Sequence, residues 1–139
     1  MTWRLLPPFL PALLLVIGCG ERAVTKRYPE AAKTPPSCLR LQIHPFSEPL
    51  ERTLRALYPF RTDCPFTLEV EHKEDIGCNS TQNVQRKTLS RFPRNFLRLE
   101  VRRGPIPLYS YYVDLDHPAD GEDARRAFAR LHGDLTLRP

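Results

Sequence analysis

Residues 96–115 constrain the fold of this chain most strongly, because they contain two runs in which apolar and polar side chains alternate. In the first run, Leu97, Leu99 and Val101 alternate with three charged residues. Strict alternation places apolar side chains on one face of a strand and charges on the other, which indicates a strand with one solvated face. The second run, 108–115, alternates in the same way and is rich in tyrosine, which suits a half-buried pleated surface.

Between these runs, Gly104, Pro105 and Pro107 interrupt the alternation. Glycine tolerates positive φ, and proline cannot donate a hydrogen bond to a strand ladder. We therefore predict a β-hairpin over Phe96–Leu115, and we expect the other elements to pack against it.

The length and composition allow one ordinary hydrophobic core. The chain has 139 residues, of which 41% are hydrophobic, and its formal net charge is +5. After a leader and a linker, roughly a hundred residues remain for one compact domain, which we place at 38–139.

The N-terminus has the organisation of a secretory signal peptide. Met1–Arg4 carries a single positive charge, and Leu5–Ile17 is apolar although three prolines interrupt it. The apolar run is shorter than the roughly 20 residues that cross a bilayer comfortably, whereas its charge, length and small-residue ending are typical of an export signal. We predict a signal peptide at 1–18 and export of the rest of the chain.

The leader ends in Val16-Ile17-Gly18-Cys19. This sequence resembles the lipobox of bacterial lipoproteins, in which an aliphatic, a permissive and a small residue precede a cysteine. The resemblance implies that Cys19 is acylated, becomes the first residue of the mature protein and anchors it to a membrane. Gly20 stands where an aspartate would mark inner-membrane retention, which implies the outer membrane. Ordinary cleavage after Gly20 is the alternative, because Gly18 and Gly20 also fit the small-residue rule of secretory signals.

We interpret residues 19–37 as a lipid-anchored flexible tether. Glu21–Ser37 is polar, lacks periodicity and ends in two prolines. A segment of this composition cannot bury a core, so we expect an extended, mostly disordered linker between the anchor and the domain.

The remaining residues predict an α+β domain. Alternation predicts three strands outside the hairpin, at 38–44, 65–72 and 84–92. One helix begins after Ser47 and ends at Leu57, and another begins after the N-cap Asp120 and ends at Gly133. We expect a small, mostly antiparallel sheet of three to five strands, with both helices on one face.

Three cysteines lie in the domain, namely Cys38, Cys64 and Cys78, so at most one internal disulfide forms. We favour Cys64–Cys78, because it closes a short loop between neighbouring segments. Cys38–Cys78 and Cys38–Cys64 remain open alternatives, and an exported protein permits any of them.

Two histidines lie among carboxylates. His72 is close in sequence to Glu71, Glu74 and Asp75. His117 is close to Asp114, Asp116 and Asp120. Neither group has a recognised ligand spacing, so we expect an acidic surface at each and no metal site. The sequence also lacks a nucleophile elbow, a phosphate-binding loop and a dinucleotide motif, so we expect neither a cofactor nor enzymatic activity.

A basic stretch between residues 83 and 103 is the remaining signal. Its arginines that could contact an anion or a partner are Arg91, Arg94, Arg98, Arg102 and Arg103. Such a face could bind a polyanion. The alternative is that these arginines pair across strands with Glu69 and Glu71 on the solvated face of the sheet.

The sequence thus indicates an exported, lipid-anchored envelope protein with a non-enzymatic binding or accessory role. Its expected partners are the membrane, through the lipid, and another envelope protein, whereas nucleic acid is not expected. One alternative is a secreted eukaryotic glycoprotein with a disulfide, because Asn79-Ser80-Thr81 is a glycosylation acceptor. Another is a polyanion-binding module that uses the arginine-rich face.

Overall fold

The structure, a computed structural model, describes residues 22–75 and 95–138. Its strands are β1 (Val24–Arg27), β2 (Arg40–His44), β3 (Phe66–Lys73), β4 (Asn95–Arg103) and β5 (Ile106–Leu115). Its helices are α1 (Glu30–Lys33), α2 (Glu48–Leu57) and α3 (Gly121–Leu135).

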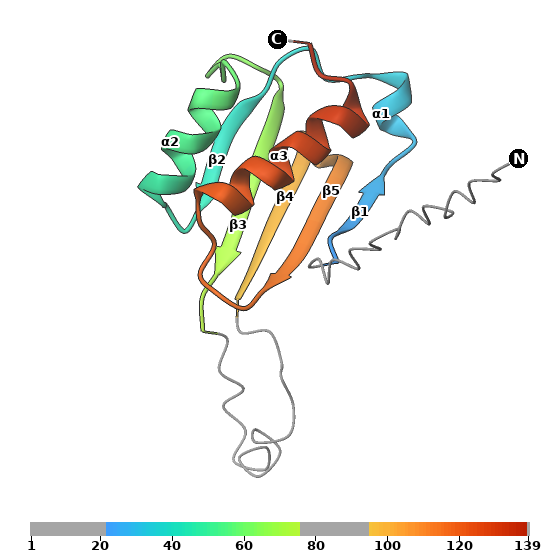
Figure 1. Cartoon of the computed structure of the whole chain (residues 1–139). Coiled ribbons are helices and arrows are strands. Elements are labelled where there is room, and N and C mark those ends of the chain that lie inside the picture. The colour runs from blue at the N-terminus through green and yellow to red at the C-terminus, as the bar shows by residue number, and fades with distance from the viewer. Residues whose placement is uncertain (1–21, 76–94, 139) are drawn as a thin grey trace, which may run out of the picture.

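The strands form one five-stranded sheet in the order β1-β5-β4-β3-β2. β2 runs parallel to β3, and the other neighbours are antiparallel. Helices α2 and α3 pack side by side on one face of the sheet (Figure 1). The predicted α+β fold, with a mostly antiparallel sheet and these two helices on one face, is therefore confirmed.

β4 and β5 form the predicted hairpin. Leu97 lies opposite Val113, and Leu99 lies opposite Tyr111. These four side chains are buried, and both leucines have no exposed surface (0%). At the turn, Gly104 has a φ of 57°, a backbone conformation that glycine adopts without a steric penalty.

α2 connects the parallel strands β2 and β3. Its residues Leu50 and Leu54 lie one turn apart and are fully buried. Leu57, which the sequence places on the same stripe, lies in the last turn and is 41% exposed. Tyr58 ends the helix in an extended conformation, as the proline after it requires.

Asp120 caps α3, as predicted. Its side chain accepts hydrogen bonds from the backbone N–H groups of Glu122 and Asp123, and the Asp123 carboxylate accepts one from the N–H of Asp120. This reciprocal arrangement is a capping box, which satisfies donors that the first turn would otherwise leave unpaired.

The prediction that α3 ends at Gly133 is wrong. The helix continues to Leu135, and Thr136 ends it with a left-handed backbone (φ 53°). Leu131 and Leu135 lie one turn apart and are both buried, so the apolar stripe continues past Gly133 and stabilises the extra turn.

The prediction of a disordered linker is wrong for residues 24–33. Residues 24–27 form β1, which pairs antiparallel with residues 109–112 of β5, and residues 30–33 form α1. Ala31 is buried in the core (1% exposed). Without β1, the outer backbone groups of β5 would form the edge of the sheet. The hydrogen bonds between β1 and β5 satisfy these groups, and they stabilise β1 although its sequence has no alternating pattern.

The disulfide joins Cys38 to Cys64, so the favoured Cys64–Cys78 pairing is wrong. Cys38 lies just before β2, and Cys64 lies just before β3. Because β2 and β3 are parallel neighbours, their starts lie at the same end of the sheet, and the two Cα atoms are 5.9 Å apart. That separation is in the normal range for a disulfide.

Several predictions lie outside the described residues. They concern the signal peptide, Cys19, the strand at 84–92, Cys78 and the glycosylation acceptor at Asn79.

Replacing Cys38 and Cys64 together by alanine should lower the free energy of unfolding by about 3–4 kcal/mol, because the bond closes a separation of 26 residues in the unfolded chain. Urea unfolding of the oxidised protein and of the double variant measures this difference. Cys78→Ser is the control and should change the stability by less than about 0.5 kcal/mol. A large loss in the control, with little loss in the double variant, would contradict the Cys38–Cys64 pairing.

Candidate functional site

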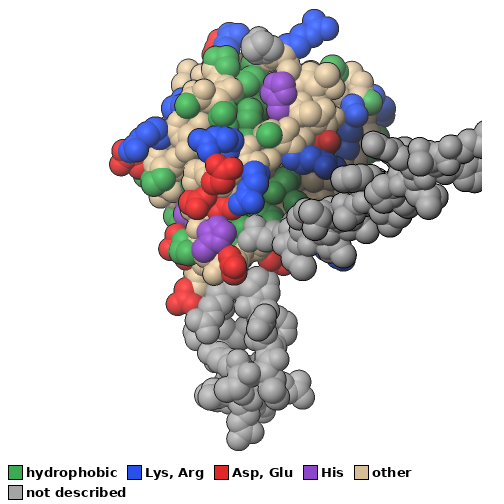
Figure 2. All heavy atoms as spheres, viewed as in Figure 1, with side chains coloured by type: hydrophobic (Ala, Val, Ile, Leu, Met, Phe, Trp, Pro, Cys, Tyr) green, Lys and Arg blue, Asp and Glu red, His purple; other side chains and the backbone are tan. Residues whose placement is uncertain are grey.

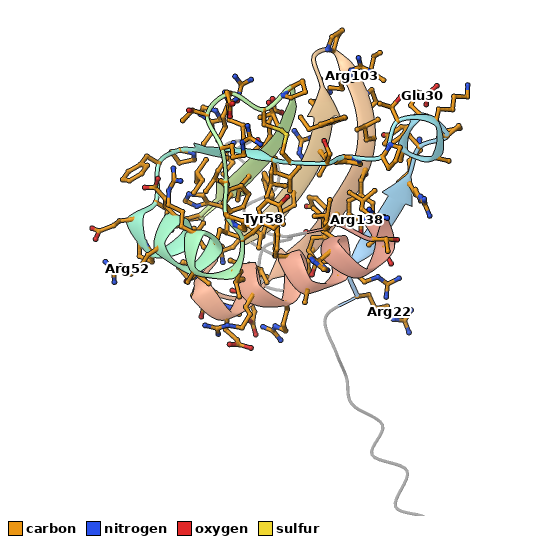
Figure 3. All side chains as sticks on the ribbon, turned by 90° about the horizontal axis from the view of Figure 1, so that it is seen from above. Arg22, Glu30, Arg52, Tyr58, Arg103 and Arg138 are labelled. Atoms are coloured by element: carbon orange, nitrogen blue, oxygen red, sulfur yellow. A yellow bond between two sulfur atoms is a disulfide. The ribbon has the colours of Figure 1, made fainter. Side chains whose placement is uncertain are left out.

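The face of the sheet opposite α2 and α3 is the candidate binding surface, and we call it the open face. Its central side chains come from alternate positions of three neighbouring strands, because successive residues of a strand point to opposite faces. They are Glu69, Glu71, Phe96, Arg98, Glu100, Arg102 and Tyr112. The view from above in Figure 3 shows α2 and α3 together on the other side of the strands.

A network of ion pairs covers the middle of the open face. The carboxylate of Glu100 lies between two guanidinium groups, with one oxygen 2.5 Å from Nε of Arg102 and the other 4.0 Å from Nη2 of Arg98. Arg98 also pairs with Glu71 at 2.9 Å, and Arg102 lies 3.8 Å from Glu69. The hydrogen bond from Arg102 to Glu100 raises the pKa of the arginine, so its guanidinium stays charged.

Two arginines of the basic stretch are therefore compensated by carboxylates on the open face. Arg98 and Arg102 pair across strands with glutamates, which is the arrangement that the sequence offered as its second interpretation. Arg103 is exposed at the end of β4, near the turn (Figure 3). Arg91 and Arg94 lie outside the described residues.

Two aromatic rings extend the open face beyond the ion pairs. Phe96 and Tyr112 stack with their ring centroids 5.5 Å apart and an interplanar angle of 27°. The Tyr112 hydroxyl donates a hydrogen bond to Asp114 at 2.7 Å. Burial of the ring and this carboxylate raise the pKa of Tyr112, so the hydroxyl remains a donor. The stacked pair offers a partly exposed apolar surface beside fixed charges.

A hollow of about 630 Å³ lies on the β2 side of the open face. Carboxylates and cations line it together, including those of Glu69, Glu71, Lys73 and Arg98. Its mixed charge suits the polar groups of a protein partner better than a ligand of one sign.

His117 forms a tight cluster with carboxylates at the start of α3. Its Nδ1 lies 2.6 Å from Asp116, and its Nε2 lies 2.8 Å from the buried Asp123. Hydrogen bonds to Asp116 and Asp123 raise the pKa of His117 to about 9, so the imidazole is protonated at neutral pH and both nitrogens donate. His117, Asp120 and Asp123 have the donor types of a metal site. Here, however, the imidazole has no lone pair to offer, and both carboxylates accept backbone hydrogen bonds.

Sequence reasoning grouped His117 with the right kind of neighbour but missed Asp123, whose capping pattern could have identified it. His72 does not join its neighbouring carboxylates. It is buried (8% exposed), and its Nε2 lies 2.8 Å from the carbonyl of Pro45. Adjacent strand residues point to opposite faces, so Glu71 and His72 are on different sides of the sheet.

A further contact, between β5 and the end of α3, could not be predicted from any local pattern. The buried Tyr109 donates a hydrogen bond to Asp134 at 2.7 Å, and Arg130 pairs with the same carboxylate oxygen at 3.0 Å. Burial of Tyr109 raises the pKa of its hydroxyl, and the hydrogen bond to Asp134 is the second largest cause. This contact attaches the last turns of α3 to the sheet.

On the opposite face, exposed acids and bases alternate over α2 and α3, and Figure 2 shows the two signs interspersed there. No helix among the described residues is both long enough and apolar enough to cross a membrane. No protein-family model matches the chain, and neither the curated proteins nor the solved structures include a match.

The His117 cluster predicts a loss of stability at alkaline pH. The pKa of His117 is about 9 in the folded protein, compared with 6.5 for an unperturbed histidine such as that of the unfolded chain. The folded protein therefore binds this proton more tightly than the unfolded chain does. The contribution of the charged His117 to the free energy of unfolding is fully present below about pH 6.5, and it is lost as the pH rises through about 9.

The free energy of unfolding, measured for the parent and for His117→Gln at pH 6 and at pH 10, isolates this effect from other titrating groups. The parent should be the more stable of the two at pH 6, and the difference should shrink at pH 10. A difference that is the same at both pH values would contradict the charged cluster.

Proposed function

We propose that this protein is exported and held at the cell envelope by a lipid on Cys19, and that its α+β domain binds another envelope component without catalysing a reaction. The Cys38–Cys64 disulfide is the observation that carries this proposal, because such bonds persist in oxidising compartments outside the cytosol. The leader and its lipobox-like ending supply the route of export and the site of the anchor.

The position of β1 limits how far the domain can stand from the membrane. β1 begins at Val24, five residues after Cys19. A fully extended chain spans at most about 3.6 Å per residue, so the strand starts within roughly 18 Å of the lipidated cysteine. A domain held this closely would present its surfaces to partners at or near the membrane.

The open face supports a binding role. It combines the stacked pair Phe96–Tyr112 with a compensated set of arginines and glutamates. Aromatic rings supply contact area and paired charges supply orientation, which is the composition of a protein-binding surface. The most conspicuous acid–histidine cluster, around His117, is engaged in holding the start of α3.

The intact mass of the N-terminal peptide of the mature protein, isolated from membranes, tests the anchor. We expect a peptide that begins at Cys19 and carries acyl chains. Cys19→Ala is the control and should abolish both the modification and the recovery in membranes. A mature protein that begins at Glu21 without a lipid would overturn the anchor and leave ordinary secretion, and the next measurement would be whether Asn79 carries a glycan.

A further inference from the structure

The two edges of the sheet differ in how they would meet another strand. β1 carries a cation on each face, Lys26 on one and Arg27 on the other, and charges of this kind protect an edge from pairing. β2 also carries a cation, Arg40, but only on the open face, where Arg40 donates a hydrogen bond to Thr67 of β3. β2 stays in register with β3 along its whole length and has no proline. Its polar side chains all lie on the open face, and its apolar ones, Leu41 and Ile43, share the helix-covered face.

The backbone of β2 directs N–H and C=O groups outward at Leu41 and Ile43. The carbonyl of Leu39 points away from β3, because it accepts a hydrogen bond from the N–H of Arg61 at 2.9 Å. Backbone groups alternate in direction along a strand, so those of Leu41 and Ile43 point to the same side. Among the described residues, no further backbone bond is made on that side of β2, which is the last strand of the sheet.

α2, the helix beside β2, carries charges of opposite sign on its outer flank. Thr53 faces α3, because its hydroxyl lies close to Gly121, the first residue of that helix. A side-chain Cβ built on Gly121 would be only 2.6 Å from this hydroxyl. Glu51 and Arg55 are two residues before and after Thr53, so each is rotated by about 200° from it and lies on the flank away from α3. That flank therefore carries an acid in the first half of the helix and a base in the second half. The two already form an ion pair within the helix, with Nε of Arg55 2.8 Å from Glu51, and both side chains stay partly exposed, so a second antiparallel helix would join two such pairs into one network of four charges.

We propose that this edge binds a second copy of the same chain across a two-fold axis, with β2 antiparallel to β2 and α2 antiparallel to α2. An axis at Gln42 places Leu41 opposite Ile43 of the second copy, where both residues direct their backbone groups toward each other and can exchange two hydrogen bonds. The symmetry repeats this pair, so four hydrogen bonds and two apolar contacts form.

The same two-fold axis relates α2 to α2 of the second copy. Three residues separate the end of β2 from the start of α2, and the Leu39–Arg61 hydrogen bond brings the chain after α2 back to the start of β2. The middle of α2 therefore lies alongside the middle of β2, and Glu51 faces Arg55 of the second copy. The charges complement each other only in this antiparallel arrangement, and the inference is independent of the lipid anchor.

Cross-linking at the axis tests the arrangement directly. Opposed residues of a pair without mutual hydrogen bonds lie about 4.5 Å apart between Cα atoms, a distance that a disulfide spans. Gln42→Cys, in a full chain that also carries Cys78→Ser, should therefore form covalent dimers on mild oxidation. Lys26→Cys in the same background is the matched control, on the open face of the other edge strand. Equal or slower dimer formation by Gln42→Cys would overturn the proposal.

A charge exchange tests the helix contact without relying on the cysteine. Glu51→Arg alone and Arg55→Glu alone should each weaken dimerisation roughly threefold to tenfold in sedimentation equilibrium, because opposed charges become alike. The double exchange restores opposite charges across the axis and should restore the affinity of the parent. Monomeric sedimentation of the parent at about 100 µM would overturn the proposal, as would a double exchange that is no better than the single variants.

Discussion

Burial of one apolar face of β4 is the interaction on which the rest of the structure depends. Leu97, Leu99 and Val101 have no exposed surface, and they lie between the partner strands β3 and β5 beneath the helices. Truncating a side chain of this kind to alanine typically costs about 2–5 kcal/mol, a large part of the stability of a small domain. The helices and both edge strands are placed by their contacts with this central layer.

The sequence predicted the elements whose pattern is local. The alternation in β4 and β5, the stripe of α2 and the cap at Asp120 each lie within a few residues of one another, so periodicity and capping rules identify them. β1 was missed because its strand character comes from β5, more than eighty positions away. The disulfide was misassigned for a related reason, since only the parallel pairing of β2 with β3 brings Cys38 to Cys64.

The open face was predictable in composition but not in arrangement. The sequence identified Arg98 and Arg102, and it offered Glu69 and Glu71 as cross-strand partners, which the register of β3 with β4 brings together. It gave no sign that the buried Glu100 would take a place between both arginines, because a residue two positions along the same strand is not an obvious partner. Tyr109 and Asp134 were missed because they meet only when α3 folds back over β5.

The two proposals use different sides of the domain. The lipid anchor would lie near the β1 edge, whereas the β2 edge would receive a second copy, and the open face between them stays available to a further partner. In this arrangement the disulfide has a second role, because it joins the segments just before β2 and β3 and so supports the strand that would carry the dimer.

Native-state hydrogen exchange tests the central layer most directly. Amide protons in the middle of β4, such as those of Leu99 and Val101, should exchange only through global unfolding and give the largest free energy of opening in the domain. Amide protons of β1, a short strand at one edge, should exchange through smaller, local openings. β4 amides that exchange as readily as those of β1 would contradict the claim that the buried face of β4 holds the domain together.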